Sequence, residues 1–129
     1  MEMLTFSAPA VNPETRPFWD ACNDGKLLVG RCTACRKHHY YPRPFCPHCG
    51  GDKVEWVEAE GTGRIYSYTV MRRFEPVRVL CMVELAEGVR MVTVLRPAEP
   101  DAVSIGLPVS LAFAESTGGQ KLPIFEPAG

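Results

Sequence analysis

Cys32-Thr33-Ala34-Cys35 and Cys46-Pro47-His48-Cys49-Gly50 are two Cys-x-x-Cys units separated by ten residues. A Cys-x-x-Cys turn places both of its sulfurs on one side of a tight loop, and two such turns facing each other complete a tetrahedron with metal–sulfur distances of about 2.3 Å. Zn²⁺ suits four soft thiolates and has no redox chemistry. The spacing therefore predicts one structural zinc ion bound by Cys32, Cys35, Cys46 and Cys49. Four thiolates leave no open position on the metal, which argues against a catalytic zinc.

Two other uses of the four cysteines stay open at this point. Iron in a rubredoxin-like site has the same ligands, because Cys₄ geometry does not distinguish the two metals. A redox dithiol is the other use, although a second pair nearby would be superfluous for it. Three histidines lie close by in sequence. Because the site is already full, we interpret them as surface groups or as partners of the ligands: His38, His39 and His48.

The residue after each pair constrains the backbone of its loop. Gly50 suits a turn that needs a positive φ, since glycine adopts such a conformation at no steric cost. Arg36 holds the equivalent place in the first unit, and its Cβ resists a positive φ. We therefore expect less regular geometry in the first loop, with the same ligands.

Downstream of the cluster the chain has the pattern of β-strands. Val54–Glu58 alternates apolar and polar residues, and five further strand-like segments follow: Arg64–Met71, Leu80–Ala86, Met91–Leu95, Val109–Glu115 and Leu122–Phe125. The longest connection, 96–108, lies between the third and fourth of these five. This order predicts a mainly β protein with a five-stranded OB-fold barrel, and an antiparallel sandwich is the alternative.

Upstream of the cluster we expect one short helix from Pro13 to Asn23. Asn12 can cap it, Pro13 suits its first position and Gly25 suits its end. Its apolar face is predicted to carry Phe18, Ala21 and Cys22. The chain then divides into an N-terminal helical segment (1–25), a zinc ribbon (26–53) and a barrel (54–129).

The composition is that of a globular protein, with 46 % hydrophobic and 22 % charged residues in 129. A formal net charge of -1 argues against a general nucleic-acid binder, which shows a strong basic excess. The sequence has no apolar run of the roughly 18 residues that a membrane span needs, and its first residues do not read as a secretory signal. We therefore expect a cytoplasmic protein whose six cysteines are thiols and metal ligands.

The cysteine units stand among further recognisable motifs between Asn12 and Pro127. The main ones are Thr15-Arg16-Pro17-Phe18-Trp19, Gly25-Lys26-Leu27, Tyr41-Pro42-Arg43-Pro44, Gly61-Thr62-Gly63-Arg64-Ile65-Tyr66-Ser67-Tyr68-Thr69, Ile105-Gly106-Leu107-Pro108-Val109 and Pro123-Ile124-Phe125-Glu126-Pro127. With these motifs in this order, the chain resembles the zinc-ribbon/OB-fold family of acyl-CoA-associated proteins, long labelled a domain of unknown function. The departure is Arg36, where the family commonly has glycine.

The resemblance implies an N-terminal helix, a rubredoxin-like zinc ribbon and an OB barrel. It also implies a non-catalytic accessory subunit of a thiolase-superfamily enzyme: a thiolase, an acyltransferase, a hydroxymethylglutaryl-CoA synthase or an aldolase that cleaves steroid side-chain CoA esters. In such hetero-oligomers of lipid metabolism and steroid degradation, the companion stabilises its partner or helps to form the acyl-CoA site. A fusion to a hydratase is natural for the family, so the chain is also interpretable as one domain of a longer protein.

Two loops are candidates for ligand contact, because OB-folds commonly bind ligands there. They span 71–78 and 116–120. Arg72, Arg73 and Arg78 of the first loop are our candidates for pairing with acyl-CoA phosphates, where a guanidinium fork fits well. A solvated basic loop is the alternative.

A second basic cluster is predicted on the ribbon, and aromatic residues are interleaved with it. Arginine and aromatic side chains are enriched at protein interfaces, so we interpret this cluster as a partner contact, with a solvated face as the alternative. Its members are Arg31, Arg36, Lys37, Arg43, Tyr40, Tyr41 and Phe45.

The alternative function is that of a single-stranded nucleic-acid-binding module. Zinc ribbons and OB-folds both do that work, and alternation predicts that Tyr66 and Tyr68 share a strand face on which bases can stack. The net charge counts against this reading. We find no nucleophile elbow, phosphate loop or paired-carboxylate motif, so the sequence favours a protein that is not itself an enzyme.

Overall fold

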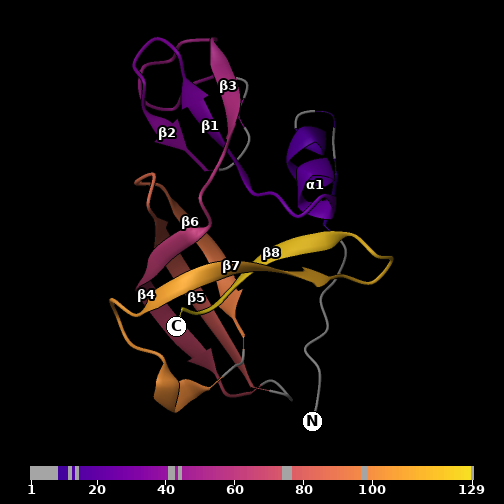
Figure 1. Cartoon of the computed structure of the whole chain (residues 1–129), viewed down its shortest axis with the longest axis vertical. Helices are drawn as coiled ribbons and strands as arrows, with labels where there is room; N and C mark the ends of the chain where they lie inside the picture. Colours follow the sequence, from indigo (N-terminus) through magenta and orange to yellow (C-terminus); the bar gives the residue numbers. More distant parts are fainter. Residues whose placement is uncertain are drawn as a thin grey trace.

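The computed structural model describes residues 9–11, 13, 15–40, 43, 45–73, 77–96 and 99–128. One short helix lies beside a small three-stranded sheet, and both stand at one end of a closed five-stranded barrel (Figure 1). The predicted mainly β architecture is confirmed. In the part of the chain that the structure describes, no helix has both the length and the apolar character needed to span a membrane.

Helix α1 runs from Arg16 to Asn23, with Thr15 at its N-cap. The predicted start at Pro13 is wrong by three residues, and the predicted cap at residue 12 lies outside the described residues. The reason is Pro17, whose missing N–H is tolerated only in the first turn of a helix. Gly25 ends the helix as expected, with a φ of 79°.

Two hydrogen bonds close the C-terminus of α1. The Lys26 N–H donates to the Ala21 carbonyl at 2.9 Å, and the Gly25 N–H donates to the Cys22 carbonyl at 3.0 Å. This pair of bonds is a Schellman motif, which satisfies carbonyls that a helix end otherwise leaves without partners.

The small sheet has the order β2-β1-β3 and is antiparallel throughout. Its strands are β1 (Leu28–Cys32), β2 (His38–His39) and β3 (Val54–Glu58). Strand β3 begins and ends where the sequence predicts, but it pairs with β1 and not with the barrel. The chain therefore passes from the small sheet to the barrel after Glu58. The sequence predicts this boundary between ribbon and barrel before Val54.

The barrel closes in the order β4-β5-β6-β8-β7, which confirms the OB-fold topology and overturns the sandwich alternative. Its strands are β4 (Thr62–Met71), β5 (Arg78–Leu85), β6 (Arg90–Leu95), β7 (Pro108–Glu115) and β8 (Lys121–Pro127). The long connection between β6 and β7 holds one 3₁₀ turn, η1 (Pro100–Ala102). The closure rests on two short contacts: β4 pairs with β7 only over Thr62, Gly63 and Arg64, and β6 pairs with β8 only at Leu95 and Phe125.

One hydrophobic core joins the barrel to the helix. Strand β5 alternates, with Val79, Cys81, Val83 and Leu85 buried, and Phe18 and Cys22 of α1 belong to the same cluster. Burial raises the pKa of the Cys22 thiol to about 12 and that of Cys81 to about 11. Both thiols are therefore neutral and act as small apolar side chains.

A bulge in β4 changes which side chains share a face. The pairing with β5 shifts between Ile65 and Ser67, so Tyr66 is the extra residue. Tyr68 then lies opposite the buried Cys81, while the guanidinium of Arg90 covers the Tyr66 ring at 4.0 Å. The expectation that Tyr66 and Tyr68 share one face is wrong, because strict alternation does not survive a bulge.

Helix α1 is fastened to the hairpin between β7 and β8. The Gln120 Nε2 donates to the Trp19 carbonyl at 3.0 Å, and the Asn23 amide bonds both the Gln120 Oε1 (3.2 Å) and the Lys121 N–H (3.0 Å). In Figure 1, β8 leaves this hairpin and passes below α1. The loop 116–120, expected to be available to a ligand, is thus engaged by the helix.

We expect Asn23→Ala to lower the free energy of unfolding by about 1–2 kcal/mol, because it removes the Asn23 partner of the Lys121 N–H and of the Gln120 Oε1. Asp24→Ala is the matched control, since Asp24 is exposed and caps the helix through its backbone. The Asp24→Ala substitution should change the free energy of unfolding by no more than about 0.5 kcal/mol. Urea unfolding followed by circular dichroism measures both, and equal losses would show that the Asn23 side chain does not hold the helix.

Candidate metal centre

The two cysteine loops have the same backbone hydrogen bonds. In each loop the first cysteine's N–H donates to the carbonyl five residues on, and its carbonyl accepts from the N–H four residues on. The bonds are Cys32 N–H to Lys37 O (3.0 Å), Arg36 N–H to Cys32 O (2.8 Å), Cys46 N–H to Gly51 O (2.8 Å) and Gly50 N–H to Cys46 O (2.9 Å). Each loop is therefore held by its own backbone hydrogen bonds, independently of a metal ion.

The equivalent residues Arg36 and Gly50 both take a positive φ, of 65° and 77°. A residue with a Cβ pays about 1–2 kcal/mol for this conformation, whereas glycine does not. The strain expected at Arg36 is present, but the expectation of less regular geometry in the first loop is wrong, because both loops make the same backbone hydrogen bonds. The loop retains its shape because the Arg36 N–H is committed to the Cys32 carbonyl.

The four cysteine sulfurs form one cluster, all within 4.8 Å of one another. Cys32 and Cys49 lie 3.6 Å apart at their sulfurs, and so do Cys35 and Cys46. A tetrahedral site with metal–sulfur bonds of about 2.3 Å has edges of about 3.8 Å, so these sulfurs are spaced as zinc ligands are. The distances are far too long for disulfide bonds, and all four cysteines are free.

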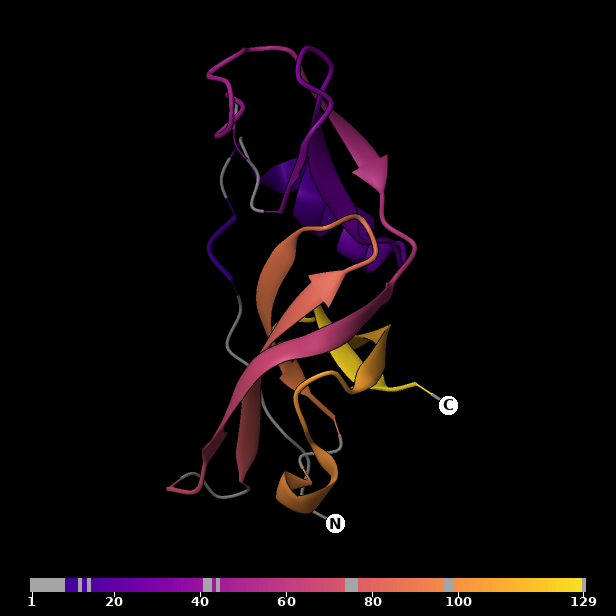
Figure 2. The same cartoon turned by 90° about the vertical axis from the view of Figure 1, so that its left-hand side faces the viewer.

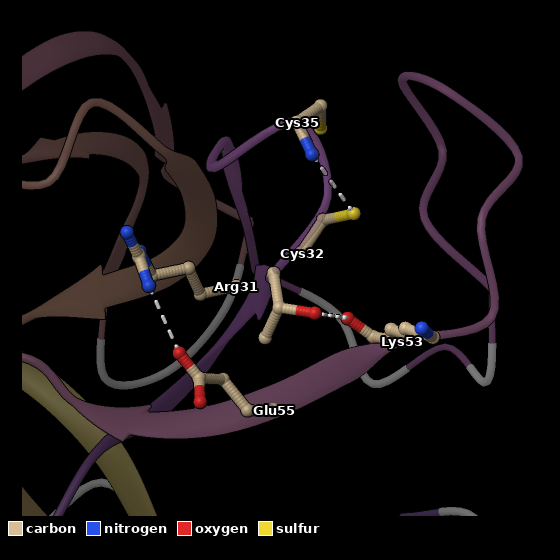
Figure 3. A network of polar contacts seen from close by, with 6 residues as sticks. Arg31, Cys32, Cys35, Lys53 and Glu55 are labelled. Carbon is tan, nitrogen blue, oxygen red and sulfur yellow. Dashed lines mark hydrogen bonds and ion pairs between the residues drawn. The ribbon is translucent and has the colours of Figure 1, made fainter.

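Backbone amides prepare the sulfurs for a cation. The Cys35 N–H donates to the Cys32 sulfur at 3.5 Å (Figure 3), and this bond is the largest of several contributions that together lower the pKa of the Cys32 thiol to about 6. At Cys49 the Gly51 amide also lowers the pKa, but the neighbouring sulfurs, Cys32 first, outweigh it and raise the pKa to about 11. Four adjacent thiolates therefore need a cation among them, and a zinc ion supplies that charge.

The strands hold the first cysteine loop in place. The Thr33 hydroxyl and N–H both donate to the Lys53 carbonyl, at 3.1 and 2.9 Å. One residue before the loop, the Arg31 guanidinium pairs with the Glu55 carboxylate at 3.0 Å (Figure 3). These contacts tie the loop to the start of β3, so the position of the metal ligands depends on the small sheet.

Histidine takes no part in the sulfur cluster of the described residues. His39 is buried in the small sheet, and its ring lies so close to Gly30 that a Cβ there would meet the ring nitrogen at 2.3 Å. The His48 Nε2 hydrogen-bonds the His38 carbonyl at 3.1 Å, so this nitrogen carries the proton. The packing of His39 on Gly30 has no signal in the sequence, because the two residues meet only through strand pairing.

The predicted acyl-CoA arginines lie at the opposite end of the molecule from the ribbon. Arg72 and Arg73 are exposed in the turn after β4, and Arg78 is half-buried at the start of β5, opposite Met71 (Figure 2). Residues 74–76 of this loop lie outside the described part. The structure does not bring these arginines together with the cysteine cluster.

The predicted basic cluster on the ribbon is only partly available to a partner. Arg31 is engaged with Glu55, and the Tyr40 ring packs edge-on against Phe18 with centroids 5.7 Å apart. Phe45 is 59 % exposed, and the other described members are also exposed: Arg36, Lys37 and Arg43. Tyr41 lies outside the described residues.

We expect Cys46→Ser to lose most of its zinc and to lower the melting temperature by at least about 10 °C, because metal binding in such ribbons is folding energy. Elemental analysis and a thermal melt measure the two effects. Cys81→Ala is the control: it alters a buried cysteine of the barrel and should keep one zinc per chain. Unchanged zinc content and melting temperature in Cys46→Ser would show that the ligand set is wrong.

Two family models match the chain in succession. The model described as "ChsH2, rubredoxin-like zinc ribbon domain" matches residues 19–55, and "ChsH2, C-terminal OB-fold domain" matches residues 56–114. The first model covers the two cysteine loops and the second covers most of the barrel. The four-cysteine cluster in such a ribbon indicates a structural metal site.

A similar solved structure is titled "Ltp2-ChsH2(DUF35) aldolase". Its chain is 40 % identical, with a TM-score of 0.84, and the match covers 95 % of this chain and 100 % of that one. A "DUF35 domain-containing scaffold protein" of Methanothermobacter thermautotrophicus is 32 % identical, over 67 % of this chain and 71 % of that protein.

A longer relative is the "Probable enoyl-CoA hydratase alpha subunit" of Thermomonospora curvata. It is 41 % identical in an alignment of 125 positions, which covers 93 % of this chain and 39 % of the relative. The chain thus spans about two fifths of the length of this relative. On the succession of both domain models and these identities, the chain belongs to the ChsH2/DUF35 family of zinc-ribbon and OB-fold proteins.

Proposed function

We propose that this chain is a non-catalytic scaffold subunit that docks on a thiolase-superfamily enzyme and helps to form or stabilise its acyl-CoA site. The observation that carries the proposal is the 40 % identity to a chain of an aldolase assembly, with full coverage of that chain and a TM-score of 0.84. The relative named as a scaffold protein supports the same role.

The metal centre fits a structural role in a scaffold protein and does not fit a catalytic role. A zinc ion held by four thiolates has no position left for water or substrate, so its contribution is to the fold. The ribbon exposes the Phe45 ring and the Arg36 side chain, and aromatic residues and arginine are enriched at protein interfaces. We assign the ribbon as one of the surfaces that contacts the partner.

The longer hydratase relative fits this proposal. Its matched part corresponds to nearly all of this chain and leaves about three fifths of the relative for other domains. We infer that the matched part of such subunits acts as a docking module for a second enzyme of acyl-CoA chemistry. An aldolase acting on steroid side-chain CoA esters is the partner that the resemblance favours.

An affinity-tagged copy of this chain, expressed in its native host, is expected to co-elute with a thiolase-superfamily enzyme that mass spectrometry identifies. The Cys46→Ser variant is the control, because loss of zinc disorders the ribbon and should abolish recovery of the partner. Recovery of no such enzyme by the native chain, or equal recovery by both baits, would contradict the proposal.

The acyl-CoA contact is assigned to the loop after β4. We expect Arg72→Ala with Arg73→Ala to weaken acetyl-CoA binding by the assembled complex about tenfold, since two charge-assisted contacts to phosphate are lost. The matched control is Arg16→Ala with Lys26→Ala, which removes two exposed positive charges near α1. Unchanged affinity in the first variant, or the same loss in both, would make the loop an ordinary solvated surface.

A further inference from the structure

A cleft of about 400 Å³ lies between the zinc ribbon and the hairpin that joins β5 to β6. The ribbon contributes His38, His39, Arg43 and His48 to its lining, and the hairpin contributes Gly88 and Arg90. Figure 2 shows the hairpin arching towards the ribbon from below. The cleft borders the second cysteine loop through Pro47 and His48, and it does not include Arg72 or Arg73.

The lining of the cleft is cationic. Its described residues include two arginines and three histidines but no aspartate or glutamate. Arg43 is exposed and forms no ion pair with any residue that the structure describes. Such a lining favours an anion over a neutral or cationic ligand.

Arg90 is held in a fixed position at the mouth of the cleft. Its Nε donates to the Glu84 carboxylate at 3.0 Å, and its guanidinium lies over the Tyr66 ring at 4.0 Å. Glu84 balances part of the positive charge but does not line the cleft. A guanidinium has five N–H donors, and this ion pair uses one of them, so the others stay available to an anion.

His39 supplies the observation that points to a ligand. The residue is 6 % exposed, and neither ring nitrogen has a hydrogen-bond partner among the described residues. Burial first, then the charges of His48, Arg43 and His38, lower the pKa of His39, so the ring is neutral and carries one N–H. A buried donor without a partner costs about 1–3 kcal/mol, which a bound acceptor would recover. The Nε2 edge of the ring lies against Gly30, which does not line the cleft, so the nitrogen relevant to a ligand in the cleft is Nδ1.

We propose that this cleft binds a phosphoryl anion, a phosphate or diphosphate group, through the Arg43 and Arg90 guanidiniums and the His39 N–H. Donors from the ribbon and the hairpin approach from two sides, and a phosphoryl group has enough acceptor oxygens to meet them all, whereas a carboxylate has two. The inference does not use the docking surface or the loop of Arg72 and Arg73. The phosphoryl site and the proposed function are therefore tested independently, and either can fail without the other.

The test is a titration of the isolated zinc-loaded chain with inorganic phosphate and diphosphate at constant ionic strength, followed by calorimetry and amide chemical shifts. Arg43→Gln with Arg90→Gln is expected to weaken diphosphate binding at least about tenfold, and His39→Phe about fivefold. Arg96→Gln is the matched control, because Arg96 also forms an ion pair at 3.0 Å, with Glu126, but does not line the cleft. Zinc content and melting temperature are measured on every variant, and the exposed Arg43→Gln alone serves if a double change unfolds the chain.

Three results would overturn the assignment: no diphosphate binding by the native chain, less than a twofold change in the double variant, or an equal loss in Arg96→Gln. Adenosine diphosphate distinguishes the source of the phosphoryl group. If adenosine diphosphate binds more tightly than inorganic diphosphate, the cleft is assigned to a nucleotide. If the two bind equally, the cleft is assigned to the free anion. Both of these outcomes support the phosphoryl site.

Discussion

The cluster of four cysteine sulfurs is the constraint on which the ribbon, with its strands β1, β2 and β3, depends. The sheet below it has strands of five, two and five residues, which is too little to bury a core of its own. Each cysteine loop closes itself through backbone hydrogen bonds, but nothing except a cation brings four thiols together as thiolates. The metal thus replaces the hydrophobic core that such a short segment cannot form, and it fixes the side chains that the ribbon presents.

The ribbon does not sit loosely on the barrel, because the two share one packed interior. Phe18 of α1 lies in the same buried cluster as the barrel strands and also meets the ring of Tyr40 beside β2. The Ala59 N–H donates to the Leu27 carbonyl at the junction, and Asn23 fastens the helix to the β7–β8 hairpin. A scaffold needs this property, since surfaces on separate parts can guide one partner only if their relative placement is fixed.

The same placement creates the cleft between the ribbon and the β5–β6 hairpin. His39 lies buried against Gly30, with both ring nitrogens free of partners among the described residues, and Arg90 approaches from the barrel side. Neither half of the molecule forms this site alone. A metal ion bound by the four sulfurs would therefore act through the fold, because it would hold the ribbon side chains of the cleft in place beside the barrel.

The sequence by itself determined the features that depend on near neighbours in the chain. The cysteine spacing predicted the four sulfurs that the structure brings together, alternation predicted the strands of the barrel, and the Cβ of Arg36 predicted a strained turn, since each is a local property. The bulge that separates Tyr66 from Tyr68 escaped this reasoning, and so did the two short strands of the ribbon, which have no alternation to reveal them. Only the tertiary structure decided the contact of Asn23 with Gln120 and the cleft around His39, because these join residues that the chain keeps far apart.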